Sequence, residues 1–178
     1  MADPPGGPQR SSLVEAAARG DVDALAQIMA RHHGDMTRIC MVITGDPDVA
    51  AEAVQAAWIV AWRRLGTLRD PERLRPWLMS IAANEARQLL RSSARRASRE
   101  LAAPPAPFGS DPAARPEVLD LAAAISRLEP DERRLIALRF SGGLTSDEIA
   151  RELGGSPSAI RGRIARVIGR LRMDLTDV

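Results

Sequence analysis

The chain has 178 residues, a formal net charge of +2 and a single cysteine, Cys40. One cysteine excludes an intramolecular disulfide and suits a reducing compartment, so we expect a cytoplasmic protein. No apolar run reaches membrane-spanning length, and the first residues contain no signal-peptide core, which argues against a membrane or secreted protein. This length accommodates one domain or two small ones.

Charge is distributed unevenly along the chain, and lysine is absent, so all 25 residues in the Lys+Arg count are arginines. Residues 71–99 hold seven arginines and two acidic residues, and residues 156–178 hold five and two, whereas the segments before each of them are net acidic. Two basic segments on predicted helices favour two contacts with one polyanion, such as a nucleic acid.

The amino-terminal part reads as successive helices. Residues 1–10 are rich in Pro and Gly and are expected to be disordered, and Asp21 is the N-cap signal of a long helix that ends at Gly45. His32, His33 and Cys40 lie in this helix, but adjacent histidines point to different faces and no further ligand completes a set. We therefore expect no metal site and no cofactor.

The next helix, from Asp48 to about Leu65, is apolar on two sides. Its core stripe consists of Val54, Trp58, Ala61 and Leu65, and a second stripe of Gln55, Ile59 and Trp62 lies about a third of a turn away. A helix of this kind either is deeply buried or docks a partner, and core packing alone is an open alternative for each residue.

A basic helix and a linker follow. The helix from Pro76 to about Arg96 places Trp77, Leu78 and Ile81 inward, its arginines outward and Asn84 near its middle. Residues 97–115 lose all apolar periodicity, and PPAP favours extended backbone, so this segment is predicted to be a flexible linker.

The last part of the chain reads as a helix-turn-helix. A helix beginning at Pro130 is expected to hold Leu135, Ile136, Leu138 and Phe140 inside. Thr145 and Glu148 form a capping box, Gly154-Gly155 ends that helix, and Ser156-Pro157 begins the next. This last helix buries Ile160, Ile164, Val167 and Leu171, and its opposite face of small residues between arginines fits a DNA major groove. A solvated basic face is the plainer alternative.

These patterns predict an all-α protein of two small helical domains joined by a flexible linker. The predicted boundaries are residues 11–96 for the first domain, 97–115 for the linker and 116–178 for the helix-turn-helix domain, after the disordered residues 1–10.

Three segments carry a family resemblance. AAEAVQAAWIVAWRRL (residues 50–65) is similar to region 2.2 of the extracytoplasmic-function (group IV) sigma factors of RNA polymerase. RPWLMSIAANEARQLLR (residues 75–91) is similar to the family's WLxxIARNxxxDxxR, although Ala83 and Gln88 replace the usual arginine and aspartate. LEPDERRLIALRFSGGLTSDEIARELGGSPSAIRGRI is similar to region 4.

The resemblance implies a factor that binds core RNA polymerase, melts promoter DNA and reads two promoter elements. It implies three sets of site residues. Core polymerase would contact Glu52, Gln55, Trp58, Ile59 and Trp62. The minus-ten element would contact Arg75, Asn84, Arg87, Arg91 and Arg95. The minus-thirty-five element would contact Ser156, Ser158, Arg161, Arg163 and Arg166.

In the minus-ten set, Asn84 would share a pocket for a flipped base with the loop of residues 65–75. The sequence departs from the family pattern at two places, which weakens the assignment of the family's functional residues to this chain there. Gly162 replaces a side chain that family members often direct at DNA, and Ala56-Ala57 replaces the usual polar pair of region 2.2.

Two other classes stay open: a stand-alone helix-turn-helix regulator that binds DNA by itself, and an adaptor that binds proteins only. No carboxylate pair, nucleophile with its base or phosphate-binding glycine loop predicts an enzyme or a small-molecule substrate. The resemblance also implies an anti-sigma partner. The linker would let the domains take different separations, and the chain ends six residues after Arg172, which leaves no room for a further regulatory domain.

Overall fold

The computed structural model describes the backbone of residues 8–100 and 116–176, and the side chains of residues 12–93 and 119–176. Every regular element in these ranges is a helix or a helical turn, which confirms the all-α prediction. None of the described helices is long and apolar enough to cross a membrane. Residues 101–115, most of the predicted linker, and residues 1–7 lie outside the described ranges.

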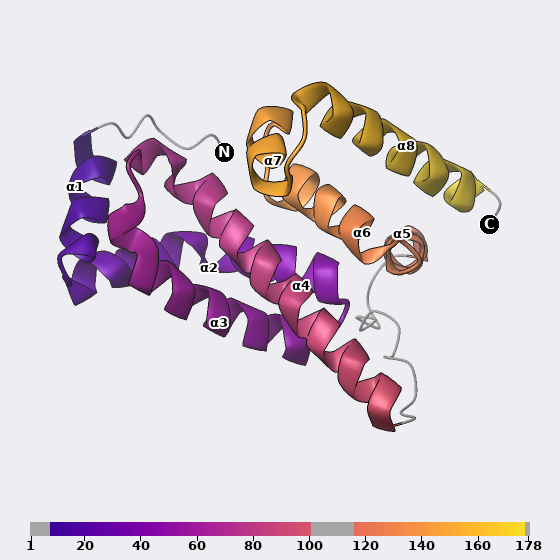
Figure 1. Ribbon diagram of the computed structural model, residues 1–178, viewed down its shortest axis with the longest axis horizontal. Helices are drawn as coiled ribbons and strands as arrows, with labels where there is room; N and C mark the ends of the chain where they lie inside the picture. The colour runs from indigo at the N-terminus through magenta and orange to yellow at the C-terminus, as the bar shows by residue number, and fades with distance from the viewer. Residues whose placement is uncertain (1–7, 101–115, 177–178) are drawn as a thin grey trace.

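The first domain is a bundle of four helices: α1 (Pro8–Ala18), α2 (Val22–Thr44), α3 (Pro47–Arg64) and α4 (Leu74–Glu100). Helices α2, α3 and α4 pack on one another, and α1 lies across one end of α2 (Figure 1). Two short 3₁₀ turns, Leu65–Thr67 and Pro71–Arg73, connect α3 to α4. Helix α1 begins within residues 1–10 and α4 ends within residues 97–115, so the helices extend into segments that the sequence pattern assigns to a disordered terminus and a linker.

Local capping explains where these helices begin and end. The Asp21 carboxylate accepts a hydrogen bond from the amide of Ala24 at 3.0 Å and thereby begins α2. Asp46 accepts from the amides of Asp48 and Val49 at 2.8 and 3.0 Å at the start of α3. Between them, Gly45 has φ 72°, a left-handed conformation that suits glycine, and it ends α2.

The second domain comprises α5 (Pro116–Ser126), α6 (Pro130–Ile136), the π-helical turn η3 (Ala137–Ser141), α7 (Ser146–Leu153) and α8 (Pro157–Thr176). Thr145 and Glu148 make the predicted reciprocal capping box of α7, and Ser156 Oγ accepts from the amide of Ala159 at 3.2 Å at the start of α8. Helices α7 and α8 therefore form the predicted helix-turn-helix, with the four expected apolar residues of α8 buried.

One core prediction for this domain is wrong, because Phe140 is 60% exposed. The amide of Gly142 donates to the carbonyl of Ala137, five residues earlier, so the backbone forms a π turn where an α-helix was expected. In an α-helix Phe140 would lie under Ile136, four residues before it. The wider turn rotates the side chains that follow Ile136 around the helix, and Phe140 faces outward.

The two domains are packed against each other. Elements α6 and η3 lie against α2 and α4 of the first domain (Figure 1). One hydrophobic core includes Ile39 and Ile43 of α2 together with Leu138 and Leu144 of the second domain. Arg133 Nη1 donates to the carbonyl of Ile43 at 2.9 Å across the same interface. A smaller apolar cluster joins α5, α6 and α8 on the far side of the second domain.

Candidate polymerase-binding and promoter-binding surfaces

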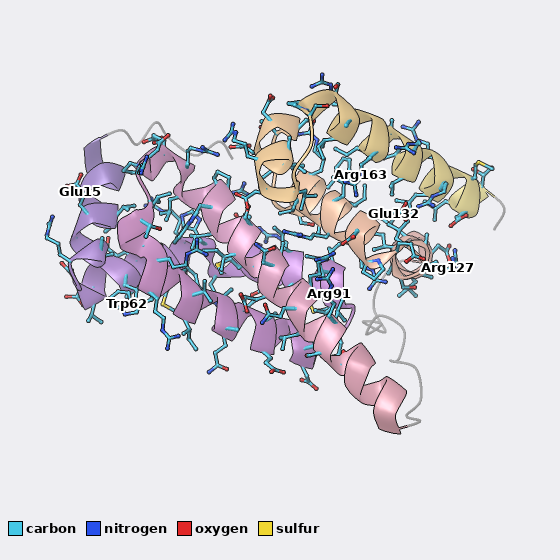
Figure 2. All side chains as sticks on the ribbon, in the orientation of Figure 1. Glu15, Trp62, Arg91, Arg127, Glu132 and Arg163 are labelled. Carbon is cyan, nitrogen blue, oxygen red and sulfur yellow. The ribbon has the colours of Figure 1, made fainter. Side chains whose placement is uncertain are left out.

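The second apolar stripe of α3 is exposed, as the sequence pattern allows. Glu52 and Gln55 are exposed, and the apolar side chains of Ile59 and Trp62 are 47% and 39% exposed. Figure 2 shows Trp62 on the outer side of α3, away from the second domain. These four residues, which we call the α3 face, follow helical spacing and form one surface. Large exposed apolar side chains in such a row indicate a protein-binding surface.

Trp58 occupies a different position from the rest of the predicted polymerase-binding set. It is 8% exposed, and its indole Nε1 donates to Nδ1 of His33 at 3.3 Å. Trp58 therefore belongs to the core stripe, which the sequence also predicts for it, and supports the α3 face from beneath. Within the described residues, no group of three His, Cys, Asp or Glu side chains could hold a metal ion.

Three of the five predicted minus-ten residues contact the second domain. Arg75 is held by Asp35, 3.0 Å from its Nε, and its Nη1 donates to the carbonyl of Gly142. Arg87 pairs with Asp131 of α6 at 2.5 Å. The side-chain oxygen of Asn84 accepts a hydrogen bond from Arg134 of α6.

The remaining two minus-ten residues lie further along α4. Arg91 is exposed, and Figure 2 shows it where α4 passes the end of α2, on the side toward the second domain. The backbone of Arg95 is helical, but its side chain lies outside the described residues. Arg75, Asn84, Arg87 and Arg91 are thus spread along one basic helix, as a surface that follows a nucleic-acid backbone requires.

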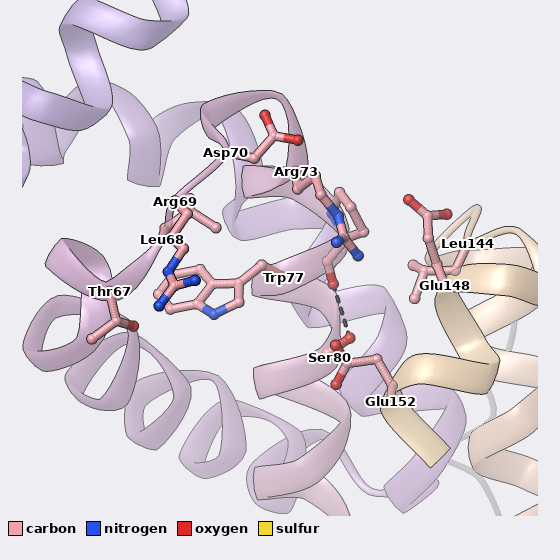
Figure 3. A pocket seen from close by; sticks show the side chains of 11 residues that line it. Thr67, Leu68, Arg69, Asp70, Arg73, Trp77, Ser80, Leu144, Glu148 and Glu152 are labelled. Carbon is pink, nitrogen blue, oxygen red and sulfur yellow. Dashed lines mark hydrogen bonds between the residues drawn. The ribbon is translucent and has the colours of Figure 1, made fainter. Parts of the chain in front are cut away.

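The loop between α3 and α4 lines a cavity of about 270 Å³, drawn in Figure 3. Its first-domain lining includes Thr67, Arg69, Arg73, Trp77 and Ser80. Asn84 does not line it, so the structure does not unite Asn84 with the loop in one pocket as the sequence-based expectation had it. Arg69, Arg73 and Ser80 are polar lining residues that sequence reasoning missed. Arg69 and Arg73 lie in the connection between α3 and α4, where no periodicity shows side-chain directions. Ser80 lies on α4, where its small side chain gave no signal of a cavity.

The second domain contributes the other wall of this cavity. Leu144, Glu148 and Glu152 line it, and Figure 3 shows the two glutamates of α7 on the side of the cavity opposite Arg73, in the 3₁₀ turn before α4, and Ser80 of α4. Glu148 belongs to the capping box, and Glu152 lies one turn further along α7. The first-domain wall therefore carries two arginines and one acidic residue, Asp70, whereas the second-domain wall carries two glutamates and no basic residue.

The predicted minus-thirty-five residues gather at the start of α8. Ser158, Arg161 and Arg166 are exposed, whereas Arg163 is half-buried on the flank of the helix. The Ser156 hydroxyl caps α8 and lies 3.0 Å from that of Ser158. Side chains added at Gly162 or Gly169 would meet nothing within 4 Å, so packing within the chain does not require either glycine.

Two arginines of α6 were not predicted to matter. Arg133 donates to the carbonyls of Ile43, Ser126 and Leu128 at 2.9, 2.9 and 3.2 Å, and so joins the end of α2 to the second domain. Arg134 is buried, and its pKa is lowered by that burial and, to a smaller extent, by Arg87. Charged residues in the first turns of a short helix are expected to be solvent-exposed, so the sequence carried no signal that the first domain would cover Arg133 and Arg134.

The fold and these surfaces define a two-domain transcription factor of the sigma type: a helical domain with a basic helix and an exposed docking face, and a helix-turn-helix domain. Residues 28–96 match Sigma-70 region 2, and residues 119–171 match Sigma-70, region 4. The chain belongs to the sigma-70 family and is an RNA polymerase sigma factor of the extracytoplasmic-function type, which initiates transcription.

Named relatives agree with this assignment. The RNA polymerase sigma factor CarQ of Myxococcus xanthus is 35% identical over 159 residues, which cover 86% of this chain and 90% of CarQ. The probable sigma factor RfaY of Xanthomonas campestris is 32% identical over 89% of this chain, although the match spans only 42% of RfaY.

Solved structures share the fold. CnrH, solved in complex with the cytosolic domain of CnrY, is 26% identical with a TM-score of 0.68, over 93% of this chain and 96% of that chain. The sigma factor RpoE of Bartonella quintana, solved with the anti-sigma factor NepR, has a TM-score of 0.70 over 87% of this chain and 98% of its own. At 23% identity it supports the fold alone.

Proposed function

We propose that the α3 face is the surface by which this sigma factor binds core RNA polymerase. The observation that carries this proposal is the exposure of Ile59 and Trp62 beside Gln55, on a helix whose other apolar stripe is buried. Apolar side chains at helical spacing, bordered by the polar Glu52 and Gln55, are suited to packing against a helix of a partner protein. Trp58 contributes by holding α3 in place from within the core.

We further propose that α4 binds the minus-ten element. Arginines on an exposed helix neutralise phosphates, and Arg75, Arg87, Arg91 and Arg95 supply four such charges. An asparagine side chain both donates to and accepts from the edge of an unpaired base, which is the role assigned to Asn84. The cavity bounded by Thr67, Arg73 and Ser80 offers polar contacts to a second unstacked base.

In this proposal α8 binds the minus-thirty-five element through the major groove. Arg161 and Arg166 flank the small residues of its exposed face, so the helix can approach the floor of the groove while both guanidinium groups reach phosphates or bases. Ser156 and Ser158 would contact the backbone at the amino end of the helix, where the free amides also favour an anion. Arg163 would reach the DNA from the flank of the helix.

The factor would act in the cytoplasm with its polymerase and carry out no chemical step of its own. A separate protein inhibitor is part of the proposal, because CnrH, which is 26% identical to this chain, was solved in complex with the cytosolic domain of another protein, CnrY. Such a partner would cover the polymerase-binding surfaces of the domains.

Copurification with core RNA polymerase tests the proposal. A sigma factor is expected to bind core in near-equal amounts and to bind isolated promoter DNA poorly. A chain that binds specific DNA tightly without core would instead be a stand-alone helix-turn-helix regulator. A chain that binds neither core nor DNA would be an adaptor protein, and the proposal would be wrong.

A further inference from the structure

The second domain contacts the part of α4 that the proposed function assigns to minus-ten DNA, and it engages individual polar groups there although Asn84 remains partly accessible to solvent. Two side chains of α6 make this contact: Arg134 donates to Asn84, and Asp131 pairs with Arg87 at 2.5 Å. We call these two pairs the α4–α6 contact. A carboxylate bound to Arg87 occupies the position that a phosphate would take, and an arginine bound to Asn84 occupies the oxygen that a base would use.

The loop cavity is covered in a similar way. Arg69, Asp70 and Arg73 line its first-domain wall, and Glu148 and Glu152 of α7 line the opposite wall. The two carboxylates that the second domain adds repel an incoming phosphate chain while the domains are packed together. The acidic residues of α6 and α7 therefore occupy space next to both parts of the proposed minus-ten surface.

Apolar packing holds the two domains together. Ile39 of the first domain shares a core with Leu138 and Leu144 of the second. A Cβ added at Gly142 would lie 2.9 Å from Cδ1 of Ile39 and 2.8 Å from the carbonyl oxygen of Leu138, closer than such atoms normally approach. The domains thus meet with close complementarity at a position where only glycine fits.

We propose that the helix-turn-helix domain is an internal competitor of minus-ten DNA: in the free chain α6 and α7 mask the basic surface of α4, and the domains must separate before that surface binds DNA. This inference rests on the proposed function of α4. The exposed residues of α8, Arg161 and Arg166, stay uncovered by the first domain in this arrangement. The masking therefore applies to the minus-ten surface and not to the minus-thirty-five surface.

The same interface contains a source of instability that makes opening feasible. Arg87 and Arg134 bring like charges together, and the pKa of Arg134 is lowered by burial and by Arg87. The buried Nε atoms of Arg87 and Arg134 have no hydrogen-bond partner among the described residues. Buried donors without partners destabilise the closed arrangement relative to one in which water or phosphate reaches them. The closed state is thus held by apolar packing and by the α4–α6 contact, and it is opposed by the unpartnered Nε donors and the like charges of its buried arginines.

The test compares two variants of the full chain with the same change of charge. Asp131→Arg replaces attraction to Arg87 by repulsion, and Asp147→Arg, in the first turn of α7, is the matched control. Asp131 is 58% exposed and Asp147 is also exposed, and each lies in the first turn of its helix, so the effects on folding should be similar. Circular dichroism and thermal unfolding check that both variants are folded.

Two measurements report domain opening. The first is amide hydrogen exchange of residues 135–144, which lie in the interface, and the second is binding of a fluorescent mixed-sequence DNA single strand of about 20 nucleotides. Asp131→Arg is expected to raise the exchange rate and to lower the Kd by about fivefold relative to Asp147→Arg, since a weakened contact raises the open population in proportion. Equal exchange and equal DNA binding by the two variants would overturn the inference.

Core polymerase binding on the same preparations separates this inference from the proposed function. If both variants bind core but show the same exchange and the same single-strand affinity, masking is wrong and the sigma-factor surfaces stand. If neither the wild-type chain nor the variants bind core, the proposed polymerase surface fails whatever the exchange rates show, and the inference loses its basis with it.

Discussion

Arg134 of α6 donates a hydrogen bond to the side-chain oxygen of Asn84 on α4, joining the two domains. Arg134 is 8% exposed, so its guanidinium is held in this contact and away from bulk water. The oxygen that it engages is the group that we assign to an unpaired promoter base. Base binding and domain packing therefore compete for one side chain, and variants of Asn84 are informative about both.

The first prediction concerns promoter melting. Asn84→Ala is expected to leave core polymerase binding intact and to slow open-complex formation, because a flipped base loses a hydrogen-bonding partner worth about 1–3 kcal/mol. Gln88→Ala, one turn further along α4, removes a similar exposed amide and is the matched control. Permanganate footprinting measures the unpaired bases. If the Asn84→Ala variant melts the promoter like the wild-type chain, Asn84 is not part of the base-binding site.

The second prediction concerns polymerase docking. Gln55→Ala combined with Trp62→Ala is expected to weaken core binding by at least about tenfold without unfolding the first domain, because both side chains are exposed and a Trp is a frequent centre of binding energy. Val22→Ala with Gln27→Ala, an exposed apolar and an exposed amide side chain on α2, is the control pair.

Binding to core and thermal unfolding are measured on the same samples for this pair of double variants. Loss of binding in the α3 variant alone, with unchanged thermal unfolding of both, assigns the α3 face to polymerase. Normal core binding by the α3 variant would contradict the assignment, as would a large drop in its Tm.

Helix boundaries were predictable wherever a capping residue marks them. Asp21, Asp46, Thr145 and Ser156 cap the helices that the sequence predicts, since a cap depends only on residues two or three positions away. The exposure of Ile59 and Trp62 was also predictable, because helical periodicity places them off the core stripe.

Features that depend on contacts distant in sequence could not be predicted. The exposure of Phe140 follows from a π turn, which has no compositional signal of its own. The burial of Arg134 and its contact with Asn84, 50 residues away, depend on how one domain packs on the other. The sequence predicted variable domain separation from the linker composition and contained no local sign of this interface.

The third prediction concerns the two glycines on the exposed side of α8. Gly162→Ala and Gly169→Ala are each expected to raise the free energy of unfolding by about 0.5–1 kcal/mol, because alanine favours helix and its methyl group meets nothing within 4 Å. Only Gly162 lies between Arg161 and Arg163. We therefore expect only Gly162→Ala to change holoenzyme affinity for upstream promoter DNA, as measured by footprint titration. Equal effects of the two variants on DNA binding would show that the α8 surface around Gly162 is not the part that enters the major groove.

The fourth prediction concerns the alkaline pH dependence of stability. Burial, and to a smaller extent Glu85, raise the pKa of Cys40 to about 12. A raised folded-state pKa means that its stability contribution is complete below the ordinary cysteine pKa of about 8.5 and is lost as pH rises toward 12. The chain contains no Tyr and no lysine, so few other groups titrate in this window.

We expect the free energy of unfolding to fall above pH 8.5 by up to about 1.4 kcal/mol per pH unit, as followed by urea denaturation. Cys40→Ala is expected to remove this slope. Reaction of the native thiol with a thiol reagent at pH 8 should also be slow and become rapid in urea. A flat profile for the wild-type chain would show that Cys40 is more accessible than its complete burial indicates.

The most direct measurement of the central claim is transcription in vitro with purified core polymerase and genomic DNA of the source bacterium as template. The account predicts discrete transcript start sites that appear only when the chain is added, and that share sequence at minus ten and minus thirty-five. It also predicts that these transcripts are reduced by the Gln55→Ala/Trp62→Ala variant and not by its α2 control. Transcription unchanged by the chain, with core polymerase shown to be active with another sigma factor, would contradict the account.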